Sequence, residues 1–239
     1  MARLSVVIPA LDEEACVAGA VASARAGAPD VEVLVVDGGS RDRTREAAAA
    51  AGATVLRAPR SRGVQLHAGA RRATGDWLVF LHADTRLGAG WAEALSLLPS
   101  SVVGGAFRLA VDSPRRAYRP LEAGVALRCR ILRLPYGDQA IFARRPVYEA
   151  VGGFPPLPLV EDVAFARRLA RAGRLAFPSV RALTSCRRWE RDGLLGATLR
   201  NWGLLALYAA GFPPERLAKL YQGDEKRPDV ANRTRERPI

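Results

Sequence analysis

Two side chains that can bind a ligand or an ion directly follow an apolar segment in the first half of the chain. Residues 78–81 (LVFL) are uncharged, and His82 and Asp84 come next. An apolar run that then meets an acid is typical of a central strand in a layered α/β protein. We expect a strand over 77–83 to place both side chains on one face, in reach of one ligand. In the alternative, Asp84 only caps the turn at residues 87–90.

The first half alternates between the patterns of strands and helices. We expect strands at residues 3–9, 31–37, 54–57 and 77–83, with helices at 13–26, 41–51 and 63–73. Repeated βα units predict an α/β fold with a mostly parallel sheet, covered by helices on both faces, and ligand sites beyond the carboxyl ends of its strands. Acids follow three of those ends, at residues 12–14, Asp37 and Asp84.

The second half is less regular and shows no linker that would separate it from the first. The helices that we expect there include 161–172, 193–210 and 214–222. We therefore predict one domain over 1–222, with 1–100 and 101–222 as its two halves. Residues 223–239 are charged, contain two prolines and lack an apolar face, which predicts a disordered tail.

Composition excludes several classes of protein. The net charge of +12 would attract phosphate, but the arginines are dispersed and no nucleic-acid module is recognisable, so we expect no nucleic-acid partner. Only two of the 36 basic residues are lysines, Lys219 and Lys226, which excludes a P-loop lysine and a Schiff-base lysine in the core. Three distant cysteines and the lack of a membrane-spanning run favour a cytoplasmic protein.

The turns after the first two strands bear on nucleotide binding. A dinucleotide-binding fold would carry a glycine-rich turn after the first strand, where this chain has residues 9–13 (PALDE). After the second strand, the Asp37 carboxylate stands beside Gly38 and could accept hydrogen bonds from a base or a ribose close to the backbone. An ordinary βα turn with Ser40 as a helix N-cap explains the same residues.

Taken together, these motifs resemble the family 2 glycosyltransferases of GT-A fold. The resemblance is carried by residues 5–14 (SVVIPALDEE), 35–42 (VVDGGSRD), 75–84 (GDWLVFLHAD), 151–154 (VGGF) and 161–169 (EDVAFARRL). Each motif is weak alone, but their order and intervals are specific. The resemblance implies a nucleotide-diphospho-sugar transferase, an αβα sandwich that takes a nucleotide diphosphate sugar as its donor.

A narrower resemblance is to a small soluble subgroup associated with arsenosugar biosynthesis. It is carried by residues 80–85 (FLHADT), 136–139 (YGDQ) and 187–190 (RRWE).

The family resemblance implies roles for residues in the first half. Asp37 and Gly38 would lie at the base, and the Arg62 guanidinium would contact the base or the diphosphate, whose oxygens it can bind in pairs. In the alternative, Arg62 faces solvent. The residues implied to contact the nucleoside are Pro9, Ala10, Leu11 and Glu13.

His82 and Asp84 occupy the place of the family's Asp-x-Asp motif. The resemblance implies that Asp84 binds Mg²⁺ or Mn²⁺, which prefer hard oxygen ligands and would stabilise charge on the departing diphosphate. His82 replaces the first acid, so one carboxylate is lost and the sequence does not specify strict metal dependence. The histidine would contact ribose or phosphate, or favour Mn²⁺.

The acceptor half carries the other implied roles. Asp162 would be the general base that takes the proton of the acceptor hydroxyl, with Glu161 as a weaker candidate, and a single base predicts inversion. In the alternative, these acids only complement a helix dipole. The residues assigned to the donor sugar and acceptor are Asp138, Gln139, Arg188 and Trp189; Asp138 could instead be a turn residue, and Trp189 a structural anchor.

We therefore expect a cytoplasmic enzyme, with peripheral membrane contact left open, that moves one sugar to a hydroxyl of a small or lipid-linked acceptor. One rival is a sugar-nucleotide nucleotidyltransferase, which would usually begin with a glycine- and arginine-rich phosphate loop that this chain lacks. The other is a non-enzymatic basic protein whose residues 202–208 (WGLLALY) lie on a membrane or a partner, whereas we expect this segment to pack on the sheet. The base, the sugar, the acceptor and the oligomeric state are not specified by the sequence.

Overall fold

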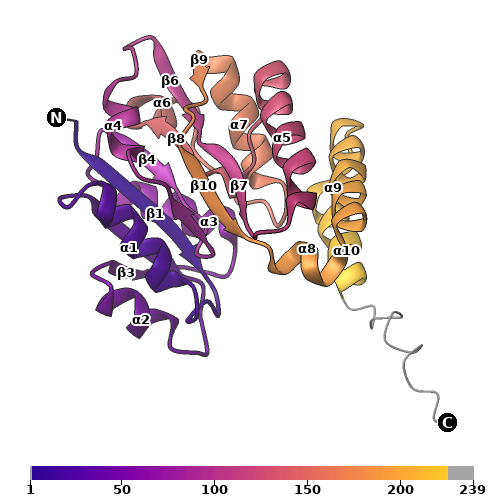
Figure 1. Cartoon of the computed structure of the whole chain (residues 1–239), viewed down its shortest axis with the longest axis horizontal. Helices are drawn as coiled ribbons and strands as arrows, with labels where there is room; N and C mark the ends of the chain where they lie inside the picture. Colours follow the sequence, from indigo (N-terminus) through magenta and orange to yellow (C-terminus); the bar gives the residue numbers. More distant parts are fainter. Residues whose placement is uncertain (1, 226–239) are drawn as a thin grey trace.

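The structure is a computed structural model that describes residues 2–225. Its centre is a seven-stranded sheet (Figure 1). The strands, in spatial order, are β3 (Thr54–Arg57), β2 (Glu32–Asp37), β1 (Leu4–Ala10), β4 (Trp77–Phe80), β8 (Ile141–Arg144), β6 (Val102–Ala106) and β9 (Arg174–Ala176). All pairs are parallel except those of β8 with β4 and β6. The mostly parallel α/β sheet that the sequence predicts is confirmed.

Strand β1 lies between β2 and β4 and is buried along almost its whole length. Val6 pairs with Val33 on one side and with Val79 on the other, and all three are buried. Valine and isoleucine favour the extended backbone, and a strand covered on both faces can be apolar at every position. Because β1, β2 and β4 are parallel, their carboxyl ends meet at one edge of the sheet.

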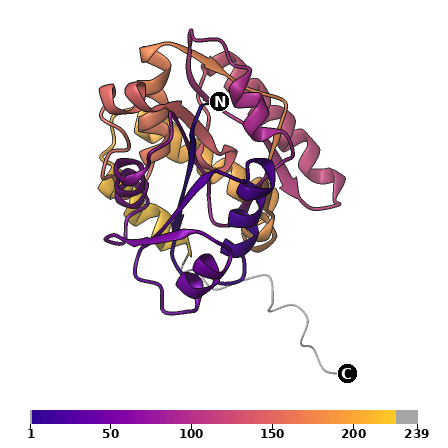
Figure 2. The same ribbon diagram turned by 90° about the vertical axis from the view of Figure 1, so that its left-hand side faces the viewer.

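Helices cover both faces of this sheet, which makes three layers (Figures 1 and 2). One face packs against α1 (Val17–Gly27), α2 (Thr44–Ala50) and α4 (Trp91–Ser96). The other packs against α3 (Arg62–Arg72), α6 (Arg145–Ala150) and α7 (Glu161–Ala172).

A second sheet of three strands follows beyond the end of the first. It consists of β5 (Thr85–Leu87), β10 (Arg181–Ser185) and β7 (Arg108–Asp112). Strand β7 continues from β6 after the single residue Phe107, so the chain passes from one sheet to the other. Helix α5 (Arg119–Leu132), entered through the short 3₁₀ turn Arg116–Tyr118, packs against β7, and a second 3₁₀ turn spans Gly137–Gln139.

The C-terminal helices lie together at one end of the molecule (Figure 1). They are α8 (Arg187–Asp192), α9 (Leu194–Ala209) and α10 (Pro214–Glu225). The expectation that residues 202–208 pack on the sheet is wrong, because α9 contacts its two neighbouring helices and leaves Trp202 68% exposed. None of the helices within residues 2–225 combines the length and the hydropathy that crossing a membrane requires.

Several element boundaries differ from those expected. Strand β4 ends at Phe80 rather than residue 83, so strand alternation does not position His82 and Asp84; they lie in the loop and turn that lead to β5. Helix α10 continues to Glu225, so the first three residues of the expected tail are helical. The rest of the tail lies outside the described residues.

Helix α3 approaches the sheet closely at Gly69. A Cβ there would lie 2.9 Å from Val36 Cγ2 and well inside van der Waals contact with Val7 Cγ1. Both valines are fully buried, so neither can move aside without disturbing the core. The close contact between α3 and β1 therefore requires glycine.

We predict that Gly69→Ala lowers the free energy of unfolding by about 1–3 kcal/mol, because the added methyl overpacks the core. Gly124→Ala is the matched control: Gly124 lies within α5, and a Cβ there would meet nothing within 4 Å. The control should gain about 0.5–1 kcal/mol from helix propensity. Urea denaturation of both variants measures the difference, and equal stabilities would contradict the close packing described.

Candidate active site

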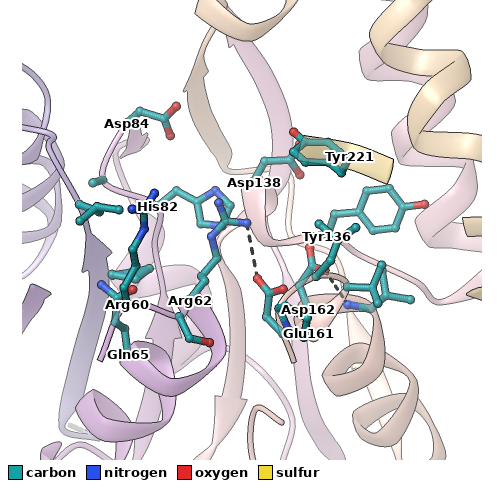
Figure 3. Close-up of a pocket in the computed structure, with 18 of the residues that line it drawn as sticks. Arg60, Arg62, Gln65, His82, Asp84, Tyr136, Asp138, Glu161, Asp162 and Tyr221 are labelled. Carbon is teal, nitrogen blue, oxygen red and sulfur yellow. Dashed lines mark hydrogen bonds and ion pairs between the residues drawn. The ribbon is translucent and has the colours of Figure 1, made fainter. Parts of the chain in front are cut away.

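A cavity of about 750 Å³ opens at the carboxyl ends of β1 and β4 (Figure 3). Its walls come from the loops after these two strands, from the start of α3, from the 136–138 turn, from the N-terminus of α7 and from the C-terminal helices. The predicted site residues that line it are Pro9, Ala10, Leu11, Glu13, Arg62, His82, Asp84, Asp138, Glu161, Asp162 and Arg188. Segments almost 180 residues apart in the sequence therefore meet at one hollow.

The loop after β1 is held by the loop after β2. The backbone amide of Asp12 donates to Ser40 Oγ at 3.0 Å, and that of Glu13 donates to Thr44 Oγ1 at 2.8 Å. In return, the Arg41 amide donates to Asp12 Oδ1 at 2.8 Å. These bonds compensate for the left-handed backbone of Asp12, whose φ is 54°. They fix the direction in which the Glu13 side chain leaves the loop.

Asp37 and Gly38 do not line the cavity, so the structure gives no support to their assignment as direct contacts of a base. The Asp37 side chain is 0% exposed and accepts hydrogen bonds from the amides of Gly39 and Ser40 and from Arg45. Burial alone would raise the pKa of Asp37, but these bonds outweigh burial and hold the pKa below its usual value. Asp37 fits the alternative interpretation, an ordinary βα turn. The Ser40 hydroxyl, however, accepts a hydrogen bond from the loop after β1 and does not cap its own helix.

Gln65 connects the first two strand ends at the cavity wall. Its amide nitrogen donates to the carbonyl oxygens of Ala10 at 2.9 Å and Val36 at 2.7 Å. A Cβ on Gly38 would lie 3.1–3.2 Å from the Gln65 amide group, so a side chain there would press on the amide that joins the strand ends. Gly38 therefore acts on the site indirectly, through close packing.

His82 lies on the wall formed by the loop after β4. Burial, with Arg62 and Arg188 nearby, holds its pKa well below the usual value, so the imidazole is neutral at pH 7. A Cβ on Gly137 would lie only 2.5 Å from His82 Nε2, so the 136–138 turn packs directly on the ring. A neutral imidazole keeps one ring nitrogen as an acceptor and one as a donor.

Asp84 faces the cavity with its side chain 29% exposed. The Arg187 guanidinium lies 3.1 Å from Glu13 Oε2 and 3.9 Å from Asp84 Oδ2, so one cation joins the two carboxylates. Ser185 Oγ holds the same guanidinium at 3.2 Å. Burial and the nearby Asp84 raise the pKa of Glu13 despite this arginine. No role was predicted for Arg187 from the sequence, although it belongs to the motif at residues 187–190.

The turn before β8 brings Asp138 to the cavity. Asp138 Oδ1 is buried and has no hydrogen-bond partner among the described residues. Burial raises the pKa of Asp138, although Arg188 and Arg128 act against that rise. A buried acceptor without a partner is costly unless a ligand or water satisfies it. The unsatisfied oxygen favours a ligand-binding role of Asp138 over that of a turn residue, and this role stays a prediction.

Two assigned residues point elsewhere. Gln139 is buried behind the turn, where its amide bonds Phe107 O and Arg128, so it cannot contact a ligand in this cavity. Trp189 packs with Val111 and Tyr118 in a small core, which makes it the structural anchor of the alternative. Neither residue lines the cavity, so neither assignment gains support, whereas Arg188 does line it.

The first turn of α7 supplies two acids in different environments. Glu161 is 3% exposed and pairs with Arg62 at 3.4 Å; burial raises the pKa of this carboxyl despite the arginine. Asp162 accepts hydrogen bonds of 2.7 Å from the amides of Gly137 and Val163, and it remains accessible from the cavity. Figure 3 shows Arg62 reaching across from the wall of His82 towards these acids.

Other residues that line the cavity were not assigned from the sequence. Some have a detectable signal: Arg60 and Ser61 precede Arg62, and Tyr136 stands in the motif at 136–139. The helical residues carried none, because an apolar helix does not reveal which face meets a cavity. The unassigned residues from the C-terminal helices are Asn201, Leu204, Leu205 and Tyr221.

The site offers limited protein ligands for a metal ion. No group of three or more His, Cys, Asp or Glu side chains within residues 2–225 is arranged to hold an ion by itself. Magnesium, however, usually takes only one or two carboxylates from the protein and completes its shell with phosphates and water. The accessible oxygens of Asp84 fit that limited contribution.

The arrangement combines two kinds of chemistry in one hollow. Guanidinium groups of Arg60, Arg62 and Arg188 can bind an anion with several oxygens. In the same hollow, Asp138 and Asp162 can accept protons or hydroxyl hydrogen bonds. An anionic ligand that also carries hydroxyl groups matches both kinds of side chain.

Comparison with known proteins identifies a family for this chain. The profile described as "Glycosyl transferase family 2" matches residues 5–125. A search of curated protein sequences gives no significant match.

Two solved structures resemble the chain closely in fold. One is residues 1–349 of S. aureus TarS in complex with UDP, at 16% identity, covering 77% of this chain and 60% of that one, with a TM-score of 0.63. The other is glucosyl-3-phosphoglycerate synthase from Mycobacterium tuberculosis with Mn²⁺, UDP and phosphoglyceric acid, at 23% identity, covering 89% of this chain and 80% of that one, with a TM-score of 0.62. The chain thus spans less than two thirds of the TarS fragment, and at these identities the likeness establishes the fold alone. Since the family profile covers half of the chain and the fold agrees, the chain belongs to glycosyltransferase family 2.

Proposed function

We propose that the protein transfers a single sugar from a nucleoside diphosphate sugar to a hydroxyl group, with inversion at the anomeric carbon. The observation that carries the proposal is the convergence of Asp84, Arg62 and Asp162 on one cavity from three separate elements. Support also comes from the family and from relatives of the same fold: TarS has been solved with UDP-GlcNAc, and the mycobacterial synthase with UDP and Mn²⁺.

The donor fits the half of the cavity near β1 and β4. The loop at residues 9–11 would contact the nucleoside, and Arg62 and Arg188 would bind the diphosphate. A planar guanidinium can bind two phosphate oxygens at once, which suits a diphosphate better than a point charge does. Asp37 contributes by fixing the turn behind this loop rather than by touching the base.

A divalent cation would be held by Asp84 together with the donor diphosphate. When bound, such an ion stabilises the charge that grows on the departing nucleoside diphosphate. Asp84 offers hard oxygens at the cavity wall, and neutral His82 beside it adds no competing positive charge at pH 7. Arg187 lies between Asp84 and Glu13, so an ion at Asp84 would have to compete with this guanidinium.

The base in this proposal is Asp162. The acceptor hydroxyl oxygen bonds to the anomeric carbon while the bond from that carbon to the diphosphate oxygen breaks, and the diphosphate keeps the electron pair. The hydroxyl proton passes to the Asp162 carboxylate, which two amides orient. Glu161 is less suited because Arg62 already pairs with it. A direct displacement of this kind inverts the anomeric configuration.

The acceptor would enter between the 136–138 turn and α9. Asp138, with an unpartnered buried oxygen, would bind a hydroxyl of the donor sugar or the acceptor. Leu204 and Leu205 give this side an apolar wall, which favours an acceptor with an apolar part, including a lipid-linked one. The exposed side chains of Leu199 and Trp202 on the same helix are compatible with contact at a membrane surface.

We propose a single catalytic domain over residues 1–222, because both halves contribute strands to the same sheet. The narrower resemblance to the arsenosugar subgroup gains no support from the comparisons and stays a prediction based on the sequence motifs. A cytoplasmic location also stays a prediction.

We predict that Asp84→Asn abolishes the Mn²⁺-dependent part of the thermal stabilisation by the preferred nucleotide, because the amide gives the ion a weaker ligand. Thermal-shift screening of UDP, GDP, TDP and CDP, each with and without Mn²⁺, first identifies that nucleotide. Stabilisation without the ion should change little. Undiminished coupling to Mn²⁺ in the variant would remove Asp84 as the ligand.

We predict that Asp162→Asn lowers the turnover number by about 10²–10⁴-fold, while donor affinity stays nearly unchanged. Glu161→Gln is the neighbouring control and should retain far more turnover, because its carboxylate pairs with Arg62 instead of facing the acceptor. Turnover is measured as nucleoside diphosphate release with an accepted sugar donor and acceptor. A reversed order of the two variants would move the base to Glu161.

We predict that Arg187→Gln increases the affinity of the nucleotide-free enzyme for Mn²⁺ by roughly two- to fivefold, as expected on removal of a partly exposed competing ion pair. Arg86→Gln is the matched control, since Arg86 is 51% exposed, pairs with Asp112 at 2.8 Å and lies on the neighbouring strand β5. Isothermal titration with Mn²⁺ measures both. A similar gain in the control, or none in Arg187→Gln, would contradict the competition.

A further inference from the structure

A second cavity, of about 660 Å³, lies where the chain passes from the large sheet to the small one. Strand β6 continues into β7 through Phe107, which lines the hollow. Helix α5 lines another side of it with Ala126 and Cys129. The volume is in the range of small-molecule sites, about 300–1,000 Å³.

The walls of this cavity are mostly apolar. Leu109, Leu175, Phe107 and Phe177 contribute side chains, and the polar Gln139 offers no free group. Its amide nitrogen donates to Phe107 O, and its amide oxygen accepts from Arg128 and from the Tyr136 amide. A ligand inside would therefore gain mainly from apolar burial, with the Ser179 hydroxyl as a further polar group in the lining.

The rim of the cavity carries positive charge only. Arg108, Arg130 and Arg174 line it from three different elements, and all three are exposed. None of the described lining residues is acidic, and no ion pair joins these arginines to a carboxylate within residues 2–225. By contrast, Arg187 in the active site is occupied by Glu13.

We propose that this cavity binds an amphipathic anion, with its apolar chain between α5 and the strands and its carboxylate or phosphate at the three arginines. An apolar interior fits the chain, and unpaired guanidiniums at the rim fit an anionic head. The site is separate from the active site and needs neither donor nor acceptor for binding. A carboxylate head would indicate a fatty-acid-like ligand, and a phosphate head a lipid headgroup.

The probes are sodium decanoate and decyl phosphate, both below their micelle-forming concentrations, with decanol and inorganic phosphate as single-feature comparisons. Isothermal titration of the full chain should give one site per chain for at least one of the two anions. Decanol and inorganic phosphate should each bind about tenfold more weakly or worse, because each lacks half of the ligand. Equal binding of decanol or of inorganic phosphate would overturn the proposal.

Two variants test whether the anion binds in this cavity. The double variant Arg130→Gln with Arg174→Gln should weaken the anion by about fivefold or more, because it removes two of the three guanidiniums. Ala126→Phe, which fills the cavity from α5, should weaken it further, and circular dichroism checks that the variant folds. Arg72→Gln, an exposed arginine on α3, is the control for lost charge. An unchanged affinity in the arginine double variant would overturn the proposal whatever Ala126→Phe does.

Discussion

The parallel pairing of β1 with both β2 and β4 is the constraint on which the site depends. It brings three strand ends to one edge of the sheet, where the chain must turn and cannot continue the ladder. Backbone groups freed at this edge are satisfied by the bonds between the loops after β1 and β2 and by Gln65. The side chains that these loops present are thereby held in place before any ligand binds.

Opposite charges then balance around the hollow. Arg62 pairs with Glu161, and Arg187 joins Glu13 to Asp84, whereas Asp138 keeps an oxygen without a partner. A cavity with both signs of charge on its walls can accept a ligand that carries a diphosphate and several hydroxyl groups. The same pairs have a second effect, because a ligand or ion that arrives must exchange an existing partner and not simply fill a charged site.

The fold was predictable from the sequence because its signals are local. Buried valine-rich runs and the alternation of strand and helix specify β1 to β4, and the helix 161–172 was expected with its observed bounds. The acids at the ends of β1 and β4 were found for the same reason. The hydrogen bonds of Asp37 within its own turn were not predictable, because a carboxylate that binds a ligand and one that binds its own turn look alike in sequence. The buried positions of Gln139 and Trp189 were not predictable either, because burial depends on distant segments. The contributions of Arg187 and α9 depend on contacts across nearly the whole chain.

The turn at residues 136–139 has one side in each cavity. Tyr136 and Asp138 face the active site, Gln139 faces the second cavity, and Arg128 holds the turn by stacking on Tyr136 and bonding Gln139. Successive residues of one short turn thus serve as a common partition. Were a ligand on one side to favour one arrangement of this partition, the affinity on the other side would change, and by reciprocity of linked equilibria the effect would be equal in both directions. A single turn of the chain separates the two cavities, so a molecule in the second would rest against the back of the wall that lines the first.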